Sequence, residues 1–522
     1  MEYDYIVIGA GSAGCAVAAR LSENPKSSVL VLEAGPPDAE LQAVHVPAAF
    51  PSMFKTELDW DYMSTPQEAL NGRQAYMPRG KMYGGSSSIN AMVYQRGNPT
   101  NYDNWNKGNI SGWGWKDVLP YFIKSENNER IESPMHGKGG PLNVAELRDP
   151  NPLTKTFVKA AEEQGYPLND DFNDGKQEGF GQYQVTQRAG MRGSAAVSYL
   201  HGAMERDNLT VEGNALTKQL VIKNGRCTGV IYEKDGEEYT ATASREVILS
   251  AGAIGSPQIM MLSGLGPKDH LKELGISVVK DLPGVGQNLQ DHALAPVAYH
   301  CIEPVSLGGA GEPEEAEKLA DGMGMLTSNI AEAGGFLTVN EGAEAPDLQF
   351  HFAPGFFILD GAGNPEGHGF TLLPGIVGTK SVGQLTLNSA DPKDKPNIDP
   401  AFLSDEHDMD VIIEGIKIAR KILNSSAFDQ YRGEEFLPGD NVQSDDEIRE
   451  FVRDYAQTIY HPVGTCKMGS DSMAVVDHHL KVHGISGLRI ADASIMPHII
   501  NANTNAPSIM IGEKCAAMIK GG

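Results

Sequence analysis

Four short apolar runs, far apart along the chain, have the length and composition of buried parallel strands. Residues 3–9 (YDYIVIG) and 27–35 (SSVLVLEAG) flank the small-residue segment 12–24, a pattern that predicts a strand, a helix and a strand. The runs at 245–253 (REVILSAGA) and 488–497 (LRIADASIMP) have the same character. We therefore expect one sheet assembled from distant segments, with a second domain inserted between them.

Two middle segments have different patterns. Residues 347–357 (DLQFHFAPGFF) alternate roughly as an antiparallel strand does, and their aromatic side chains could line a pocket. Packing in the core is the commoner fate of such residues. Residues 302–324 are rich in glycine and acidic side chains. They predict a mobile surface loop, which is either a lid over a site or a solvated connection.

Length and composition narrow the class of protein. A chain of 522 residues suits two connected domains better than one core. The net charge of −26 would repel phosphate backbones, which argues against a nucleic-acid partner. We find no run long enough for a membrane anchor and no signal-peptide pattern. Five dispersed cysteines without a CxxC pair favour reduced thiols and a cytoplasmic protein. The oligomeric state is not readable.

The strongest local motif is GAGSAG at residues 9–14. Gly9 would make a tight turn, Gly11 would let the backbone approach a pyrophosphate, and Gly14 would allow close packing of helix and strand. Glu33, 19 residues after Gly14, ends the next strand, where a carboxylate binds a ribose hydroxyl. This context predicts a bound adenine dinucleotide, but these residues do not separate NAD from FAD.

A second glycine- and serine-rich segment, RGKMYGGSSSINAMVYQRG, spans residues 79–97. Such a loop offers backbone N–H groups to an anion, or lets the backbone approach a flat ring. The density of small polar residues before Asn90 makes a plain turn the weaker interpretation.

His461, in HPVGTC, allows three interpretations. It could bind a metal with Cys466, form a pair with a thiol nucleophile, or act as a base. A metal site needs three or four ligands, and no further pair is evident, so we predict no metal site. Spacing alone does not show that imidazole and thiol meet, and Cys466 is better explained as a small packed residue.

Six segments in fixed order resemble the glucose–methanol–choline (GMC) oxidoreductases, including their choline-dehydrogenase-like and alcohol-dehydrogenase-like bacterial branch. They are GAGSAG…LEAG, GKMYGGSSSINAMVYQRG, GAIGSPQIMMLSGLG (252–266), LPGVGQNLQDH (282–292), HPVGTCKMG (461–469) and ADASIMPHIINANTNAPSIMIGEK (491–514). The resemblance covers essentially the whole chain. One departure is Tyr83, where the family usually has an aliphatic residue or Trp.

The resemblance implies FAD as the cofactor and a two-part α/β fold. A discontinuous Rossmann-like FAD-binding domain would comprise residues 1–150, 205–292 and 456–522. An α+β substrate-binding domain with an antiparallel sheet would comprise residues 151–204 and 293–455.

The same resemblance assigns cofactor-binding residues. Gly11, Ser12 and Glu33 would hold the ADP half of FAD, and Val221 would contact adenine through its backbone. The remaining implied contacts are Gly85 and Asn90 along the pyrophosphate and flavin, Asp492 and Ala493 at the ribityl–phosphate region, Asn503 at the flavin end, and Gly9, Gly14, Ala34, Val93 and Ala251 around them. Some relatives attach FAD through a histidine just before the signature asparagine. That position is Ile89 here, so we expect noncovalent FAD.

The resemblance also assigns the chemistry. His461 would take the hydroxyl proton of a primary alcohol as hydride moves to flavin N5, and Asn505 would orient the alcohol oxygen. His292 is interpreted as structural. O₂ or another electron acceptor would reoxidise the flavin. The alternatives are a choline-type enzyme, with Glu303 as a possible carboxylate for the cation, and the flavin-containing lyases of the family, hydroxynitrile lyase and fatty acid photodecarboxylase.

Overall fold

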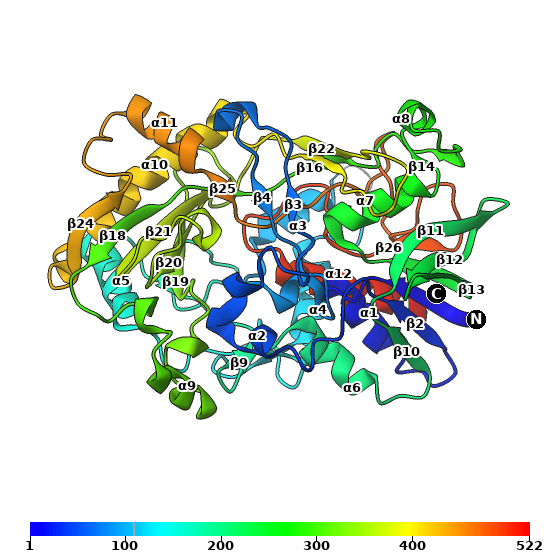
Figure 1. The fold of residues 1–522 in the computed structure, drawn as a ribbon, viewed down its shortest axis with the longest axis horizontal. Coiled ribbons are helices and arrows are strands. Elements are labelled where there is room, and N and C mark those ends of the chain that lie inside the picture. Colours follow the sequence, from blue (N-terminus) through cyan, green and yellow to red (C-terminus); the bar gives the residue numbers. More distant parts are fainter. Residues whose placement is uncertain (108–109, 522) are drawn as a thin grey trace.

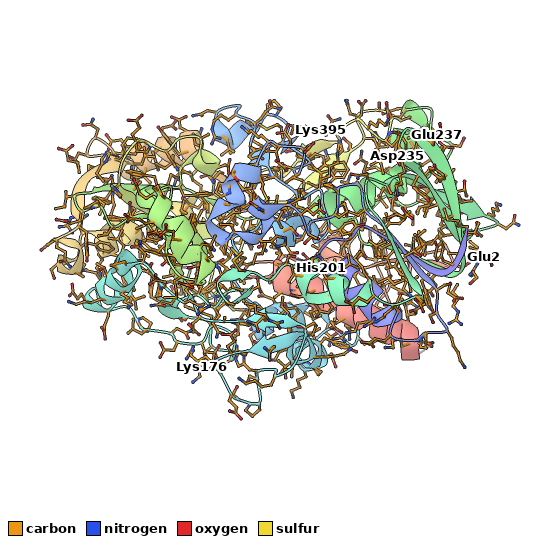
Figure 2. The ribbon with its side chains drawn as sticks, turned by 60° about the horizontal axis from the view of Figure 1, so that its bottom comes forward. Glu2, Lys176, His201, Asp235, Glu237 and Lys395 are labelled. Carbon is orange, nitrogen blue, oxygen red and sulfur yellow. The ribbon has the colours of Figure 1, made fainter. Side chains whose placement is uncertain are left out.

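Two β-sheets lie at opposite ends of the molecule, and the helix α12 (Asn505–Gly521) runs near its middle (Figure 1). The computed structural model describes residues 1–107 and 110–521. Side chains fill the space between the ribbons (Figure 2). The labelled acidic residues Glu2, Asp235 and Glu237 belong to the part of the chain around the N-terminal sheet, and they are exposed.

The first sheet confirms that distant segments form one sheet. Its order is β10 (Leu209–Glu212), β2 (Val29–Leu32), β1 (Glu2–Ile8), β13 (Glu237–Leu249), β12 (Arg226–Lys234) and β11 (Leu216–Lys223), and β26 (Leu488–Ile490) also pairs with β13. Strands β10, β2, β1, β13 and β26 run parallel to one another. Strand β12 pairs antiparallel with both β13 and β11. The side chains of Val29–Leu32 are all buried, as expected for a central parallel strand.

Helix α1 (Ser12–Leu21) follows β1 and packs against α12. The two backbones approach closely because Gly512 has no side chain: a Cβ there would lie 2.5 Å from the carbonyl oxygen of Ala13. Helix α7 (Gly252–Leu262) begins where β13 ends. The N-termini of α1 and α7 therefore open at the carboxyl ends of adjacent parallel strands, where ligands bind in such sheets.

The second sheet is antiparallel, as predicted. Its order is β24 (Arg432–Leu437), β18 (Val297–Cys301), β21 (Gly369–Ile376), β20 (Leu348–Ala353), β19 (Ala333–Leu337) and β7 (Gly179–Gln182), extended by β17 (Ala293–Leu294) and β25 (Gln457–Thr458). Helices α5 (Pro152–Glu163) and α10 (Glu406–Leu423) pack on it. Helix α11 (Asp445–Tyr455) contacts α10. The fold class is thus confirmed, while the exact domain limits stay a prediction.

The segment 302–324 is partly helical. It contains α9 (Pro313–Ala320), whose Glu315 accepts a hydrogen bond from the backbone N–H of Met325 at 2.5 Å. In Figure 1 this helix lies at the outer edge, below the second sheet. No helix in the described ranges has both the length and the apolar composition required to cross a bilayer.

Smaller elements connect and flank the two sheets. They are α2 (Gln42–His45), α3 (Pro99–Trp105), α4 (Trp115–Ser125), α6 (His201–Ala203), α8 (Lys268–Glu273), β3 (Tyr62–Met63), β4 (Tyr76–Met77), β5 (Glu126–Asn128), β6 (Leu142–Val144), β8 (Gln187–Arg188), β9 (Met191–Arg192), β14 (Leu265–Gly266), β15 (Lys280–Asp281), β16 (Gln287–Leu289), β22 (Gly383–Thr386) and β23 (Asn397–Asp399).

Candidate active site

One long cavity joins the two parts of the fold. It begins at the N-terminus of α1, passes the 79–97 segment, and ends against β20 and β21 of the second sheet. Most of the residues predicted to bind the cofactor line it, namely Gly9, Gly11, Ser12, Glu33, Ala34, Gly85, Asn90, Val93, Ala251, Asp492, Ala493 and Asn503. His461 and Asn505 line it as well.

The three glycines of the 9–14 motif have different environments. Gly9 has φ +95°, and a Cβ on Gly14 would lie 1.9 Å from the Gly9 carbonyl oxygen. Both positions therefore require glycine for the turn and for close packing. A Cβ on Gly11 would meet no atom within 4 Å. Gly11 thus exposes its backbone to the cavity, at the positive end of α1.

Glu33 closes the turn at the end of β2. Its carboxylate accepts hydrogen bonds from the backbone N–H groups of Ala10 and Gly35, both at 2.9 Å. Burial raises the pKa of Glu33 to about 7, although hydrogen bonds to Gly35 and Ala10 oppose that effect. A hydroxyl donor bound in the cavity would add a third hydrogen bond to this carboxylate.

The 79–97 segment wraps around the start of α1. Gly85 has φ +52°, and a Cβ there would lie 2.8 Å from Gly11 Cα. The side-chain oxygen of Asn90 accepts hydrogen bonds from Arg192 Nη1 at 2.8 Å and from the Met92 backbone N–H at 3.0 Å. These contacts fix the segment as a wall of the cavity.

The opposite wall carries a buried carboxylate. Asp492 accepts hydrogen bonds from the Gly252 N–H at 2.9 Å, the Ser256 hydroxyl at 2.6 Å and the Ser494 N–H at 2.8 Å. It therefore joins the N-terminus of α7 to the turn after β26, beside Ala251 and Ala493.

Val221 lies elsewhere than its assignment requires. It pairs with Gly229 in the β11–β12 ladder, whereas Ala215, Leu216 and Thr217 line the cavity at the start of β11. A backbone contact to adenine is better supported for Leu216 or Thr217. Within β11, only Leu216 and Thr217 at its start line the cavity.

His461 lies at the end of the cavity next to the second sheet, and it has contacts on three sides. Its backbone N–H donates to Asp291 at 2.8 Å, and its Nδ1 lies 3.1 Å from Nδ1 of His292. Its Nε2 lies 3.2 Å from the side-chain nitrogen of Asn503. Asp291 also accepts the backbone N–H of His292 at 2.8 Å, so one buried carboxylate anchors both histidines.

The two C-terminal asparagines do not lie where they were expected. Asn503, expected at the flavin end, faces His461. Asn505, expected to orient the alcohol beside His461, accepts a hydrogen bond from the Ser12 hydroxyl at 2.7 Å. Asn505 is the first residue of α12, so its side chain lies against the start of α1. Asn503, rather than Asn505, is therefore the amide beside His461.

His351 was missed by the sequence analysis. It lies on β20, lines the cavity, and has Nε2 3.5 Å from the Asn503 side-chain nitrogen. A signal existed, since a histidine interrupts the apolar strand 348–353. All six residues of β20 are buried, however, so its alternation did not distinguish a pocket from core.

Three imidazoles meet in this apolar region, and all are neutral near pH 7. Burial lowers the pKa of His292 to about 3 and that of His351 to about 4. Burial, followed by repulsion from His292, His351 and Arg79, lowers the pKa of His461 well below 6.5. A neutral imidazole has one nitrogen free to accept a proton, which suits a general base.

The walls around His461 are mainly apolar. A buried cluster lines this end of the cavity, comprising Phe50, Ile89, Leu294, Ala353, Phe357, Leu373 and Ile459. Among the described residues that line the whole cavity, the charged ones are Glu33, Arg79 and Asp492. Glu303, the carboxylate considered for choline, is exposed on the chain after β18.

The structure does not favour the metal and thiol interpretations of HPVGTC. Cys466 is fully buried, its backbone N–H donates to Ser494, and burial raises the pKa of its thiol well above the ordinary value. It is therefore a packed thiol rather than a thiolate. In the described residues, no group of three or more His, Cys, Asp or Glu side chains is placed to hold a metal ion.

The residues of the cavity fit FAD. The bare backbone of Gly11 at a helix N-terminus suits a pyrophosphate, and Glu33 suits a ribose. The cavity continues past Gly85 and Asn90 to His461, so it accommodates a ligand longer than ADP.

Comparison with known proteins agrees with this geometry. The chain matches the GMC oxidoreductase family over residues 3–294 and 379–512. It is 43% identical to mitochondrial choline dehydrogenase of Mus musculus, over 100% of this chain and 90% of that protein. It is 44% identical to an alcohol dehydrogenase [acceptor] of Pseudomonas putida, over 99% and 95%.

Among solved structures, formate oxidase of Aspergillus oryzae, a protein studied for modification of its FAD, superposes with a TM-score of 0.94. The two are 29% identical, with 100% of this chain and 98% of that chain covered. The chain therefore belongs to the GMC oxidoreductase family, enzymes that oxidise CH–OH groups and typically use FAD.

Proposed function

We propose that this enzyme oxidises a primary alcohol with an apolar aliphatic or aromatic substituent to the aldehyde. The observation that carries the proposal is the pairing of a buried, neutral His461 with Asn503 at an apolar end of the FAD cavity. The electron acceptor is O₂ or another oxidant, and the assay below distinguishes the two.

FAD, His461 and Asn503 have separate roles in the proposed reaction. Bound FAD supplies a hydride acceptor at N5. His461 Nε2 takes the hydroxyl proton, and the Asn503 side-chain N–H donates to the alcohol oxygen and orients it. The loss of one proton and one hydride converts the alcohol to the aldehyde. Burial of the site excludes water, which strengthens these hydrogen bonds.

The apolar wall selects the substituent. Burying an aliphatic chain or ring against Phe50, Phe357 and Leu373 is favourable by about 25 cal/mol per Å² of apolar surface. Arg79 also lines the cavity, and its positive charge disfavours a positively charged substrate. The similarity to an alcohol dehydrogenase [acceptor] supports this substrate class.

Choline is the second candidate. Aromatic residues that line the cavity could surround a quaternary ammonium group, namely Phe50, Phe54, Trp60, Tyr62, Phe357 and Tyr460. The similarity to choline dehydrogenase points the same way. Both carboxylates of the cavity, Glu33 and Asp492, are engaged at its cofactor-binding part. We therefore rank choline below an apolar alcohol.

We propose that FAD is held noncovalently. The side chain that precedes Asn90 is Ile89, which lines the cavity and has no nucleophilic atom. Precipitating the holoenzyme with acid should leave a colourless pellet and a yellow supernatant. A yellow pellet would show a covalent link.

The main test measures flavin bleaching anaerobically with benzyl alcohol, 1-hexanol and choline. We expect the first two to reduce the flavin faster at equal concentration. Replacing His461 by Ala should slow flavin reduction by about 10²–10⁴-fold, whereas the control substitution at the exposed His479, His479→Ala, should not.

A separate assay compares peroxide formation with dye reduction and identifies the electron acceptor. Cyanide release from mandelonitrile, or hydrocarbon formation in light, would instead indicate a lyase.

A further inference from the structure

Gln349, on β20, lies behind the proposed catalytic pair and is not among the residues that line the cavity. Its side chain is fully buried. Its Nε2 donates to Oδ1 of Asn503 at 2.9 Å. Because this bond occupies the Asn503 oxygen, the Asn503 NH₂ group points toward His461 Nε2, 3.2 Å away. An amide nitrogen can only donate, so this contact requires an acceptor lone pair on His461 Nε2.

The contact with Asn503 also determines which nitrogen of His461 carries a proton. A neutral imidazole with a bare Nε2 carries its proton on Nδ1. That nitrogen faces Nδ1 of His292, 3.1 Å away, so His292 accepts and carries its own proton on Nε2. The Val377 backbone acts to raise the pKa of His292, against the larger effect of burial. The Nε2 atom of His292 is buried and has no hydrogen-bond partner among the described atoms. Donors and acceptors therefore alternate from Gln349 to His292.

The phenol of Tyr183 is a further polar group near Gln349. Tyr183 donates its only O–H to the Phe350 carbonyl at 2.6 Å. Burial raises the pKa of Tyr183, and an interaction with the Gln349 side chain opposes that effect. The direction of the Gln349 amide follows from its donation to Asn503. The Gln349 oxygen has no hydrogen-bond partner among the described atoms.

We propose that Gln349 is a positioning residue that sets the tautomer of His461 through Asn503. Reversing the Gln349 amide would turn the Asn503 oxygen toward His461 and place the imidazole proton on Nε2. The base would then have no lone pair facing the alcohol. This inference rests on the proposed function, because it assumes that His461 is the base.

Two substitutions separate the direction of the hydrogen bond to Asn503 from the packing of the side chain at position 349. Gln349→Glu keeps the shape, but an ionised carboxylate only accepts, so it should draw the Asn503 NH₂ away from His461. Gln349→Met removes the hydrogen bond without reversing it. The matched control is Gln187→Met, a buried amide on β8 that donates to the Thr327 carbonyl at 3.0 Å.

The measurement is the rate constant of anaerobic flavin reduction by the best alcohol of the panel. At pH 8 we expect a loss of about 10²-fold for Gln349→Glu and about tenfold for Gln349→Met, with no change for the control. As the pH falls, the introduced carboxyl becomes protonated and can again donate a hydrogen bond to the Asn503 oxygen. The rate of flavin reduction by Gln349→Glu should therefore rise as the pH falls. Loss of a general base would have the opposite pH dependence, because protonation of a base lowers the rate.

The tautomer itself is read by ¹⁵N NMR of histidine-labelled holoenzyme, with the His461 signals assigned by their loss in His461→Asn. Wild type should show the proton on Nδ1, and Gln349→Glu should show it on Nε2 at high pH. The proposal is wrong if Gln349→Glu retains the Nδ1 proton, or if both Gln349 variants reduce flavin at the wild-type rate. If His461→Ala also reduces flavin at the wild-type rate, the proposed function fails first.

Discussion

Nε2 of His461 lies 3.2 Å from the side-chain nitrogen of Asn503, while Asn505 hydrogen-bonds to Ser12 at the start of α1. Two asparagines only two positions apart therefore face different parts of the cavity. The relationship separates an amide that faces His461 from one that contacts the start of α1.

Replacing each asparagine should have a different effect. Asn503→Ala removes the donor beside the base, so flavin reduction should slow by about 10²-fold while FAD content stays unchanged. Asn505→Ala removes the Ser12 contact, so FAD retention should fall while the rate of FAD-saturated enzyme changes little. Stopped-flow reduction and flavin-to-protein ratios measure the two effects. The opposite pattern would restore Asn505 as the group beside the base.

The pH dependence of kcat/KM should lack an acidic limb near 6.5. The pKa of His461 lies well below that ordinary value because of burial and then repulsion by its neighbours, so the base stays unprotonated as the pH falls through 6.5. We expect a plateau between pH 6 and 8. A fall with an apparent pKa of about 6.5 that disappears in His461→Gln would contradict this environment.

Two glycines of the 9–14 motif should respond differently to Ala. In Gly14→Ala the new Cβ would meet the Gly9 carbonyl at 1.9 Å, so the turn must distort and the free energy of unfolding should fall. In Gly11→Ala it meets nothing within 4 Å, so apoprotein stability should be retained while FAD affinity falls. Thermal unfolding of apoprotein and FAD titration distinguish the two. Equal destabilisation of both variants would argue against a cofactor contact at Gly11.

A buried ionic cluster away from the cavity should make stability depend on pH. His136 lies 3.0 Å from both Glu126 and Asp171, and Glu126 also pairs with Arg96 at 2.7 Å. Burial works to lower the pKa of His136, but hydrogen bonds to Asp171 and Glu126 outweigh it and raise the pKa above 6.5. Its contribution is therefore complete below pH 6.5 and is lost as the pH rises through the folded-state pKa.

Urea unfolding of wild type and His136→Gln tests this cluster. The variant should lose about 3 kcal/mol at pH 6, and the difference should shrink toward pH 9. Lys218→Gln, which removes a surface ion pair with Glu238, is the control and should leave the unfolding free energy nearly unchanged. A pH-independent difference for His136→Gln would show that its role is packing rather than charge.

The local sequence determined the elements around the cofactor. Apolar runs, the 9–14 glycines and Glu33 predicted β1, α1 and β2, because buried parallel strands and phosphate-binding turns impose strict local requirements. The distant runs at 245–253 and 488–497 indicated the other parallel strands. The antiparallel strand at 347–357 was predicted as well, because its pattern is also local.

Only the tertiary structure decided which side chains meet. Asn503 and Asn505 have equivalent chemistry in the sequence, and the point where α12 begins determines which of them faces His461. His351 and Gln349 lie on a strand buried on both faces, where hydropathy carries no directional information. Hydrogen bonds between residues more than a hundred positions apart depend on distances that exist only after the two sheets have packed around the cavity.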